Sequence, residues 1–304
     1  MSSIVEVKNF TKRFGGFTAV DDISFNVEEG SIFAFLGPNG AGKSTTINTL
    51  CTIIDKTEGI LKINGNEVSD HKDRVRNEIG IVFQESTLDS KLSIEENLKF
   101  HCDFYRVPKN EIKERIDFVL ELVKLEDWRK ASVSSLSGGM KRRVEIARGL
   151  VHYPRVLFLD EPTTGLDPQT RANIWDYIYK LQKQKNITIF LTTHYMDEAE
   201  ICDKVAIMDH GRIVAFDSPY NLKKQYTSNI TRIRTADEAA LERFLSERSY
   251  KYKSEDGLFT VYLNELGPVL DMVSENKASI IDFETSKGTL NDVFLAITGK
   301  EIRG

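Results

Sequence analysis

Residues 32–44, IFAFLGPNGAGKS, decide the fold of this 304-residue chain. Ile32 to Leu36 is an uninterrupted apolar run, which is typical of a strand covered on both faces. The next eight residues, Gly37 to Ser44, match the pattern G-x-x-x-x-G-K-[ST]. Further short apolar strands alternate with segments of helical spacing. The chain is therefore predicted to be α/β, with a mainly parallel sheet at its core.

The glycine-rich turn has the composition of a phosphate-binding loop (P-loop). Its glycines let backbone N–H groups wrap around a polyphosphate, and the helix N-terminus attracts the negative charge. Lys43 is predicted to reach the β- and γ-phosphates of ATP, and the Ser44 hydroxyl to bind Mg²⁺. A glycine turn that only caps a helix is the alternative, which the Lys43-Ser44 pair disfavours. The predicted nucleotide-binding residues of this segment are Gly37, Asn39, Gly40, Ala41, Gly42, Lys43, Ser44 and Thr45.

A second apolar run, Val156 to Leu159, ends in the adjacent carboxylates Asp160 and Glu161. A strand that ends this way places one carboxylate near Mg²⁺ and the other near the γ-phosphate. Asp160 is therefore the predicted metal carboxylate, and Glu161 is predicted to orient or deprotonate the attacking water. Two solvated acids at a strand end are the alternative, and the phosphate-binding loop upstream makes it less favoured.

The third informative segment is Leu136 to Met140, LSGGM, and a basic helical run follows it. A Ser- and Gly-rich helix start is an anion-binding element, and here it occurs in a chain with one phosphate-binding loop. By itself such a segment would more often be a helix cap than a ligand site.

With these three segments, residues 4 to about 220 resemble the ATPase domain of the ATP-binding-cassette (ABC) transporter family. LSGGM matches the family's LSGGQ signature except at Met140, and the phosphate-contacting Ser and both Gly are present as Ser137, Gly138 and Gly139. The resemblance implies that two copies pack head to tail around two ATP molecules. The signature of one copy would then complete the site of the other.

The resemblance also implies roles for residues outside these segments. Gln84 matches the loop glutamine that contacts Mg²⁺ and the attacking water, and His194 matches the switch histidine that contacts the γ-phosphate. Phe14 lies where the family places an aromatic ring that stacks on adenine, and residues 165–168, GLDP, match a loop that crosses the dimer interface. A lone Gln, His or Phe would usually be structural, but these fall at the expected points in chain order. The predicted catalytic residues are Glu161, His194, Gln84 and Lys43, and the predicted metal ligands are Ser44, Gln84 and Asp160.

The predicted organisation is a P-loop ATPase domain over residues 1–222, with a mixed sheet core and a helical subdomain at about 86–150. In the family this subdomain docks the membrane subunits. A small α+β module follows over residues 228–304. Its end, 289–299, resembles the tail of drug-resistance ABC ATPases of the daunorubicin type, which favours export over import.

Composition limits the alternatives. A net charge of −5 argues against nucleic acid as a partner. Three scattered cysteines, Cys51, Cys102 and Cys202, predict neither a disulfide framework nor a zinc site and fit a reduced compartment. No stretch approaches the roughly 18 to 20 apolar residues that span a bilayer.

The resemblance therefore implies an ATPase at the cytoplasmic face of the cell membrane that powers transport through separate polytopic permease subunits. It would dimerise with itself or with a related ATPase. The alternative is a soluble ABC ATPase that acts in DNA repair or translation. Such proteins usually carry two cassettes, long coiled coils or zinc modules, and the sequence has none of these patterns. The cargo pathway would lie in the membrane partner, so the sequence predicts no substrate.

Overall fold

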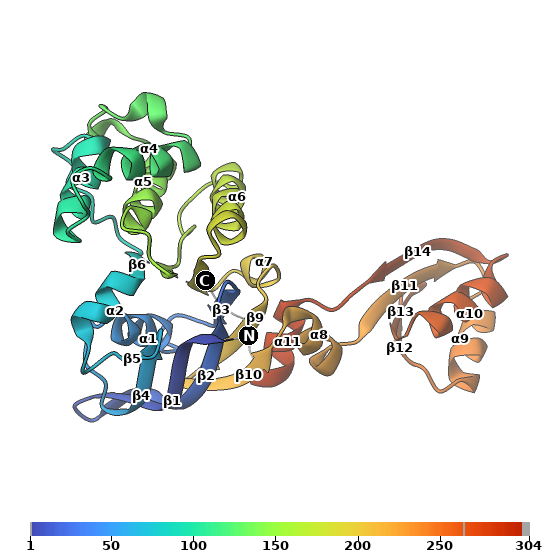
Figure 1. Ribbon diagram of the computed structural model, residues 1–304. Coiled ribbons are helices and arrows are strands. Elements are labelled where there is room, and N and C mark those ends of the chain that lie inside the picture. The colour runs from blue at the N-terminus through green and yellow to red at the C-terminus, as the bar shows by residue number, and fades with distance from the viewer. Residues whose placement is uncertain (1, 264, 300–304) are drawn as a thin grey trace. The chain divides into compact units, whose positions relative to one another are not determined.

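The computed structural model describes residues 2–263 and 265–299 and divides the chain into two compact units between Asp217 and Ser218 (Figure 1). The sequence placed this boundary between residues 222 and 228. The structure places α8 (Pro219–Tyr226) in the second unit, where it packs against α11 (Leu290–Thr298). The predicted domain ends at residues 1 and 300–304 lie outside the described residues.

The centre of the first unit is a six-stranded sheet in the order β10-β9-β3-β8-β7-β6. Its strands are β3 (Ile32–Leu36), β6 (Ile79–Val82), β7 (Val156–Asp160), β8 (Thr188–Thr193), β9 (Lys204–Asp209) and β10 (Arg212–Asp217). β3 pairs in parallel with β8 and β9, and β7 pairs in parallel with β6 and β8, whereas β10 joins antiparallel to β9. All residues of β3 are buried. The mixed sheet confirms the predicted α/β fold class.

A smaller antiparallel sheet shares the hydrophobic core of this unit. Its strand order is β2-β1-β4-β5. Its strands are β1 (Ser3–Phe14), β2 (Phe17–Glu28), β4 (Glu58–Ile63) and β5 (Asn66–Glu67). Phe25 of β2 stacks on Phe33 of β3 with ring centroids 5.4 Å apart, so the two sheets are joined by aromatic packing. The first unit also contains the helices α1 (Lys43–Leu50), α2 (Lys72–Glu78), α6 (Pro168–Lys185) and α7 (Met196–Ala199).

Three helices gather in the part of the unit predicted as a helical subdomain (Figure 1). They are α3 (Ile94–Phe104), α4 (Ile112–Leu122) and α5 (Gly138–Leu150), with short 3-10 turns at Glu126–Trp128 and Val133–Ser135. Ser93 and Glu96 form a capping box at the start of α3, which satisfies backbone N–H groups that the first turn leaves free. Within the described residues, no helix has the length and apolar character needed to cross a membrane.

The second unit contains a four-stranded antiparallel sheet in the order β12-β13-β11-β14. Its further elements are β11 (Asn229–Thr235), α9 (Glu238–Glu247), β12 (Lys251–Glu255), β13 (Leu258–Leu263), α10 (Leu266–Asn276) and β14 (Ile280–Ser286). This βαββαβ order is ferredoxin-like. Residues of α9 and α10, such as Leu241 and Met272, share a core with Ile233 and Phe259 of the sheet. The predicted α+β module therefore has a hydrophobic core of its own.

Candidate nucleotide-binding site

The phosphate-binding loop lies between β3 and α1 and is held tightly against neighbouring strands. A Cβ atom at Gly37 would lie 2.3 Å from the carbonyl oxygen of Met208 in β9, so only glycine fits there. Gly42, which precedes the first residue of α1, has a φ of 103°, a conformation that favours glycine. The loop backbone can therefore approach a phosphate chain without side chains in the way.

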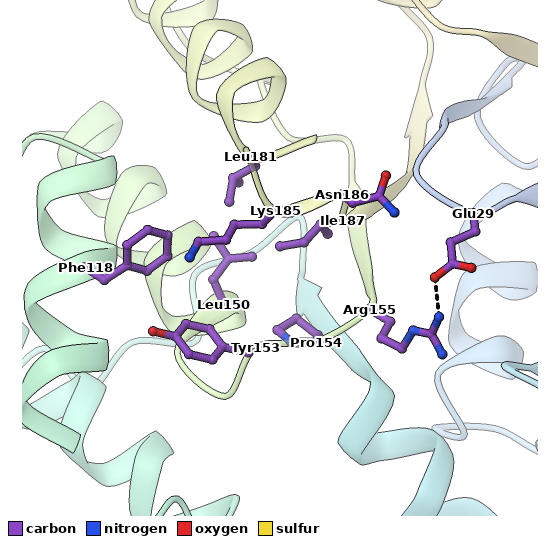
Figure 2. Close-up of a pocket in the computed structure, with 10 residues that line it drawn as sticks. All are labelled: Glu29, Phe118, Leu150, Tyr153, Pro154, Arg155, Leu181, Lys185, Asn186 and Ile187. Atoms are coloured by element: carbon purple, nitrogen blue, oxygen red, sulfur yellow. Dashed lines mark hydrogen bonds and ion pairs between the residues drawn. The ribbon is translucent and has the colours of Figure 1, made fainter. Parts of the chain in front are cut away.

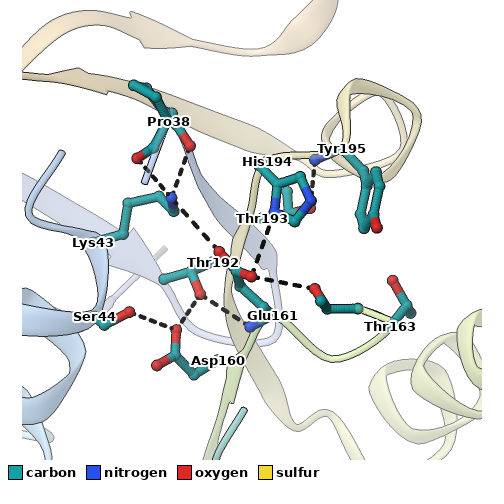
Figure 3. A network of polar contacts seen from close by, with 12 residues as sticks. Pro38, Lys43, Ser44, Asp160, Glu161, Thr163, Thr192, Thr193, His194 and Tyr195 are labelled. Carbon is teal, nitrogen blue, oxygen red and sulfur yellow. Dashed lines mark hydrogen bonds and ion pairs between the residues drawn. The ribbon is translucent and has the colours of Figure 1, made fainter. Parts of the chain in front are cut away.

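Lys43 is buried at the first turn of α1 and contacts its own loop. Its Nζ donates to the carbonyl oxygens of Gly37 at 2.7 Å and Pro38 at 3.0 Å, and it lies 3.7 Å from Oε1 of Glu161 (Figure 3). Burial lowers the pKa of Lys43, and the carboxylates of Glu161 and Asp160 oppose that shift. These contacts place one ammonium group between the loop and the carboxylates at the end of β7.

Asp160 is the last residue of β7, and its carboxylate is fixed from two sides. Oδ1 accepts hydrogen bonds from the hydroxyl of Ser44, at 3.1 Å, and from the hydroxyl of Thr192 at the end of β8. Gln84 follows β6 and lines the same cavity as Ser44. Hydroxyl, carboxylate and amide oxygens are the ligand types that Mg²⁺ prefers.

These oxygens fit the predicted metal ion only as part of its coordination. Among the described residues there is no group of three or more His, Cys, Asp or Glu side chains arranged to hold a metal. Mg²⁺ in nucleotide sites is usually held by one or two carboxylates together with substrate phosphates and water. Ser44 and Asp160 therefore fit a metal that arrives with the nucleotide.

Glu161 has an unusual backbone for a non-glycine residue, with a φ of 46°. Its N–H donates to the carbonyl and hydroxyl oxygens of Thr192, and its Oε2 accepts from the hydroxyl of Thr164 at 3.2 Å. Left-handed conformations of this kind cost about 1–3 kcal/mol and occur preferentially at functional sites. The surrounding hydrogen bonds hold the Glu161 carboxylate toward Lys43.

His194 follows β8 and faces the same carboxylate. Its Nδ1 lies 3.4 Å from Oε2 of Glu161, close enough for an ion pair, but the geometry is not that of a hydrogen bond. Within the described residues this buried nitrogen has no hydrogen-bond partner. The structure thus brings together Lys43, Ser44, Asp160, Glu161 and His194, which lie far apart in the sequence (Figure 3).

A cavity of about 230 Å³ opens beside these groups. Its lining residues are Phe17, Ala19, Asn39, Gly40, Gly42, Lys43, Ser44, Thr45, Gln84 and Glu161. Phe14 is not among the described residues that line this cavity. It is 48% exposed, and the Lys12 ammonium lies over its ring. Phe17, which the sequence analysis did not single out, lines the cavity. The pattern RFGGF contains both rings and could have suggested either.

The signature segment lies outside this cavity. Ser137 caps α5 by accepting a hydrogen bond from the N–H of Met140 at 3.2 Å, and both Ser137 and Gly138 are exposed. Gly139 faces Thr170 of α6, where an added Cβ would lie 2.5 Å from Cγ2. A helix start with exposed N–H groups remains available to an anion from another molecule.

A larger cavity, of about 320 Å³, lies elsewhere in the first unit (Figure 2). Arg155 and Ile187 line it, and these residues directly precede β7 and β8. The Lys185 ammonium lies 4.4 Å from the Phe118 ring centroid at its other side. Ligands of open α/β sheets bind at the carboxyl ends of the strands, where Glu161 and His194 lie, and this cavity is at the amino ends. It is therefore not the nucleotide site.

Comparisons with known proteins agree with this geometry. Residues 20–164 match the family described as ABC transporter. The Nod factor export ATP-binding protein I of Ralstonia nicotianae (strain ATCC BAA-1114 / GMI1000) is 36% identical over 306 residues, which cover 99% of this chain and 95% of that protein. The chain belongs to the ABC transporter family. It is an ATP-binding subunit and an ATPase.

The chain is also similar to other ABC proteins over most of its length. The daunorubicin/doxorubicin resistance ATP-binding protein DrrA of Streptomyces peucetius is 34% identical, covering 97% of this chain and 92% of that protein. A solved structure of cbiO1 from Clostridium perfringens, described as part of the ABC transporter complex cbiONQ, has a TM-score of 0.69 and 30% identity, covering 81% of this chain and 96% of that one. The ATP-binding cassette MJ0796, solved as a dimer bound to ADP and Pi, has a TM-score of 0.64 and 29% identity, covering 70% and 98%.

These comparisons bear on the two functions that the sequence left open. The transporter ATPase is confirmed, and the comparisons give no support to a soluble ABC ATPase of DNA repair or translation. ABC ATPase subunits bind nucleotide, dimerise and work with membrane components. The roles of individual site residues stay predictions.

Proposed function

We propose that this chain is the ATP-hydrolysing subunit of an ABC exporter and works as a head-to-tail dimer at the cytoplasmic face of the cell membrane. The observation that carries the proposal is the cluster of Lys43, Asp160, Glu161 and His194 at the carboxyl ends of the central strands, beside a cavity that Lys43 and Glu161 line. The signature helix start, at Ser137, lies apart from it and is exposed. Half of each site is then supplied by the second copy.

In this proposal Lys43 exchanges its bonds to the Gly37 and Pro38 carbonyls for bonds to the β- and γ-phosphates. Ser44, Asp160 and Gln84 hold Mg²⁺, which supplies neutralising charge when bound. Glu161 accepts a proton from, or orients, the attacking water, and His194 donates to the γ-phosphate. Preorganised donors and acceptors of this kind are the main source of catalysis in phosphoryl transfer.

The membrane partner is proposed to be a polytopic permease that docks on the helical subdomain. Phe100 and Phe104 of α3 are exposed, and a cavity of about 600 Å³ lies beside Phe104 and Arg106. Exposed apolar patches rimmed by charges are typical of protein interfaces. Export is favoured because the relatives over the whole chain include a Nod factor export protein and a daunorubicin resistance protein.

The decisive experiment uses the Glu161→Gln variant with Mg-ATP. We expect this variant to bind ATP, to hydrolyse it roughly 10²- to 10³-fold more slowly than the parental protein, and to accumulate as a dimer in size-exclusion chromatography with light scattering. Lys43→Ala is the control and should stay monomeric because its phosphate binding is lost. A Glu161→Gln variant that turns over at the parental rate would contradict the role of Glu161, and one that stays monomeric with saturating Mg-ATP would contradict the dimer.

The transport part has its own test. Affinity purification of the full chain from gently solubilised membranes should recover a multi-span membrane protein in stoichiometric amount, and Phe100→Asp with Phe104→Asp should reduce that recovery while leaving the basal ATPase rate unchanged. Recovery of nucleic acid in its place would argue against the proposal.

A further inference from the structure

Arg142, six residues after the start of the signature LSGGM, is buried in a socket of backbone carbonyl groups. Its Nε donates to the carbonyl oxygen of Pro162 at 2.6 Å, and its Nη2 donates to those of Asp160 and Glu161, both at 3.2 Å. Its Nη1 donates to the carbonyl oxygen of Phe83 and, at 3.0 Å, to Oε2 of Glu145. The side chain is only 7% exposed.

The socket fits a guanidinium group and no other side chain. Arginine has five N–H donors in a fixed planar fork, and Arg142 has one acceptor for each of them. Lysine has three donors on a single atom, and glutamine has two. Four of the five acceptors are main-chain atoms, so this arrangement fixes the path of the backbone.

Two of the segments that Arg142 joins carry predicted catalytic side chains. The Phe83 carbonyl directly precedes Gln84, and the Asp160, Glu161 and Pro162 carbonyls form the turn after β7. That turn includes the left-handed backbone of Glu161, with its φ of 46°. A strained backbone conformation persists only where surrounding contacts hold it in place, and the hydrogen bonds from Arg142 are among those contacts.

The same face of α5 secures the loop of Gln84 at its other end. Oε1 of Glu145 accepts from the N–H of Thr87 at 3.1 Å, and Nη1 of Arg148 donates to the carbonyl of Thr87 at 2.9 Å. Arg142, Glu145 and Arg148 are three residues apart and therefore lie along one side of the helix. α5 itself starts at the signature, so one rigid element contacts both loops.

We infer that Arg142 is a positioning residue for ATP hydrolysis, which holds the Glu161 turn and the Gln84 loop in register with the signature helix. This inference rests on the proposed function, because it acts through the roles proposed for Glu161 and Gln84. Arg142 does not touch the phosphate-binding loop in any contact that the structure shows among the described residues. Its loss should therefore slow turnover more than it weakens ATP binding.

The test uses the full chain with Arg142→Lys and Arg142→Gln. Misplacing a catalytic group by about 1 Å can cost on the order of 10²-fold in rate, so we expect kcat to fall by about that factor for both variants, with the Kd for Mg-ATP close to the parental value. Arg142→Gln removes the positive charge that is bonded to Oε2 of the buried Glu145 carboxylate and can destabilise the fold. Arg142→Lys keeps the positive charge beside Glu145, and melting curves for both variants separate folding from catalysis.

Arg143 provides the matched control on the same helix. Its Nη1 donates to the carbonyl of Val123 at 3.0 Å, in the helical subdomain and away from the catalytic loops. Arg143→Lys should keep the parental kcat. A kcat for Arg142→Lys that equals the parental value, or a loss as large in Arg143→Lys, overturns the inference.

A double-mutant cycle shows whether Arg142 acts through Glu161. Arg142→Lys is measured by single turnover in the parental and in the Glu161→Gln background. If Arg142 positions Glu161, its substitution should cost far less once the carboxylate is gone, whereas equal factors in both backgrounds indicate a general structural defect and overturn the inference. Glu161→Gln with a parental rate would instead refute the proposed function itself, so the two failures are distinguishable.

Discussion

At the residue scale, the charged groups of the nucleotide site are paired with one another or with backbone carbonyls. The Lys43 ammonium is bonded to two carbonyls of its loop and faces Glu161, and Glu161 also faces His194. A buried charge without partners would be costly, so these contacts stabilise the arrangement of the site. ATP phosphates offer Lys43 stronger, charge-assisted acceptors than carbonyl oxygens, which favours the exchange.

The two phenylalanines beside the loop lead to a prediction about adenine. Stacking of a base on an aromatic ring is worth about 1–3 kcal/mol, so removing the stacking ring should raise the Kd for ATP about 10-fold or more. If Phe14 has that role, Phe14→Ala weakens ATP binding in calorimetry and Phe14→Tyr does not. Phe17→Ala is the comparison, because Phe17 lines the cavity and its ring is 65% exposed. A loss confined to Phe17→Ala would show that the prediction for Phe14 is wrong.

At the element scale, the packing of α3 against the end of α5 depends on a histidine that is neutral when folded. The His152 ring stacks on Tyr105 with centroids 3.7 Å apart, and its Nε2 contacts the carbonyl of Ile79 at 2.9 Å. Burial lowers the pKa of His152 to about 4; the bond to Ile79 opposes this and the Arg115 charge adds to it. The ring is therefore neutral in the folded protein down to that pH.

This packing predicts acid sensitivity. In the unfolded chain His152 binds a proton below its ordinary pKa of 6.5, whereas in the folded chain it does so only near pH 4. The stabilisation from the neutral ring is therefore complete above pH 6.5 and is lost as the pH falls from 6.5 toward 4. His152 accounts for a decrease of about 3 kcal/mol in the free energy of unfolding across this pH range. His152→Gln should flatten the decline of melting temperature across that window, and His71→Gln, at an exposed site, should not. Equal declines in all three proteins would contradict the assignment.

The sequence predicted the elements whose residues carry a strong local pattern. The strand, turn and helix around Gly37 to Ser44 were predicted because glycine and lysine at fixed spacing serve a specific backbone shape. α8 was not predicted, because its sequence, PYNLKKQY, is mostly polar, and the structure shows it packed against α11, which is far away in the sequence. The Arg142 socket was missed because its acceptors are backbone carbonyls, which any residue can supply.

At the scale of the whole molecule, each unit has its own hydrophobic core. One core joins β3 and its neighbouring strands to the smaller sheet of the first unit, and another joins Ile233 and Phe259 to α9 and α10 of the second. Separate cores are expected to unfold in separate steps, because two-state behaviour is a property of single domains.

Scanning calorimetry of the full chain should therefore show two transitions, and Mg-ATP should raise only one. Ligand at about 100 times its Kd stabilises the unit that binds it by about 2.7 kcal/mol, or about 5–10 °C for a unit of this size. Lys43→Ala should lose the shift and keep both transitions. A single transition that moves as a whole would show that the units unfold together.

The position of β3 in the central sheet also has a consequence for synthesis on the ribosome. β3 spans Ile32–Leu36, but its two neighbours, β8 and β9, span Thr188–Thr193 and Lys204–Asp209. At about 5–20 residues per second, the strand that leads into the nucleotide loop emerges many seconds before either neighbour exists. A nascent chain that stops short of β9 has no complete sheet on which to mount that loop, so the capacity to bind ATP arises only once synthesis has passed Asp209.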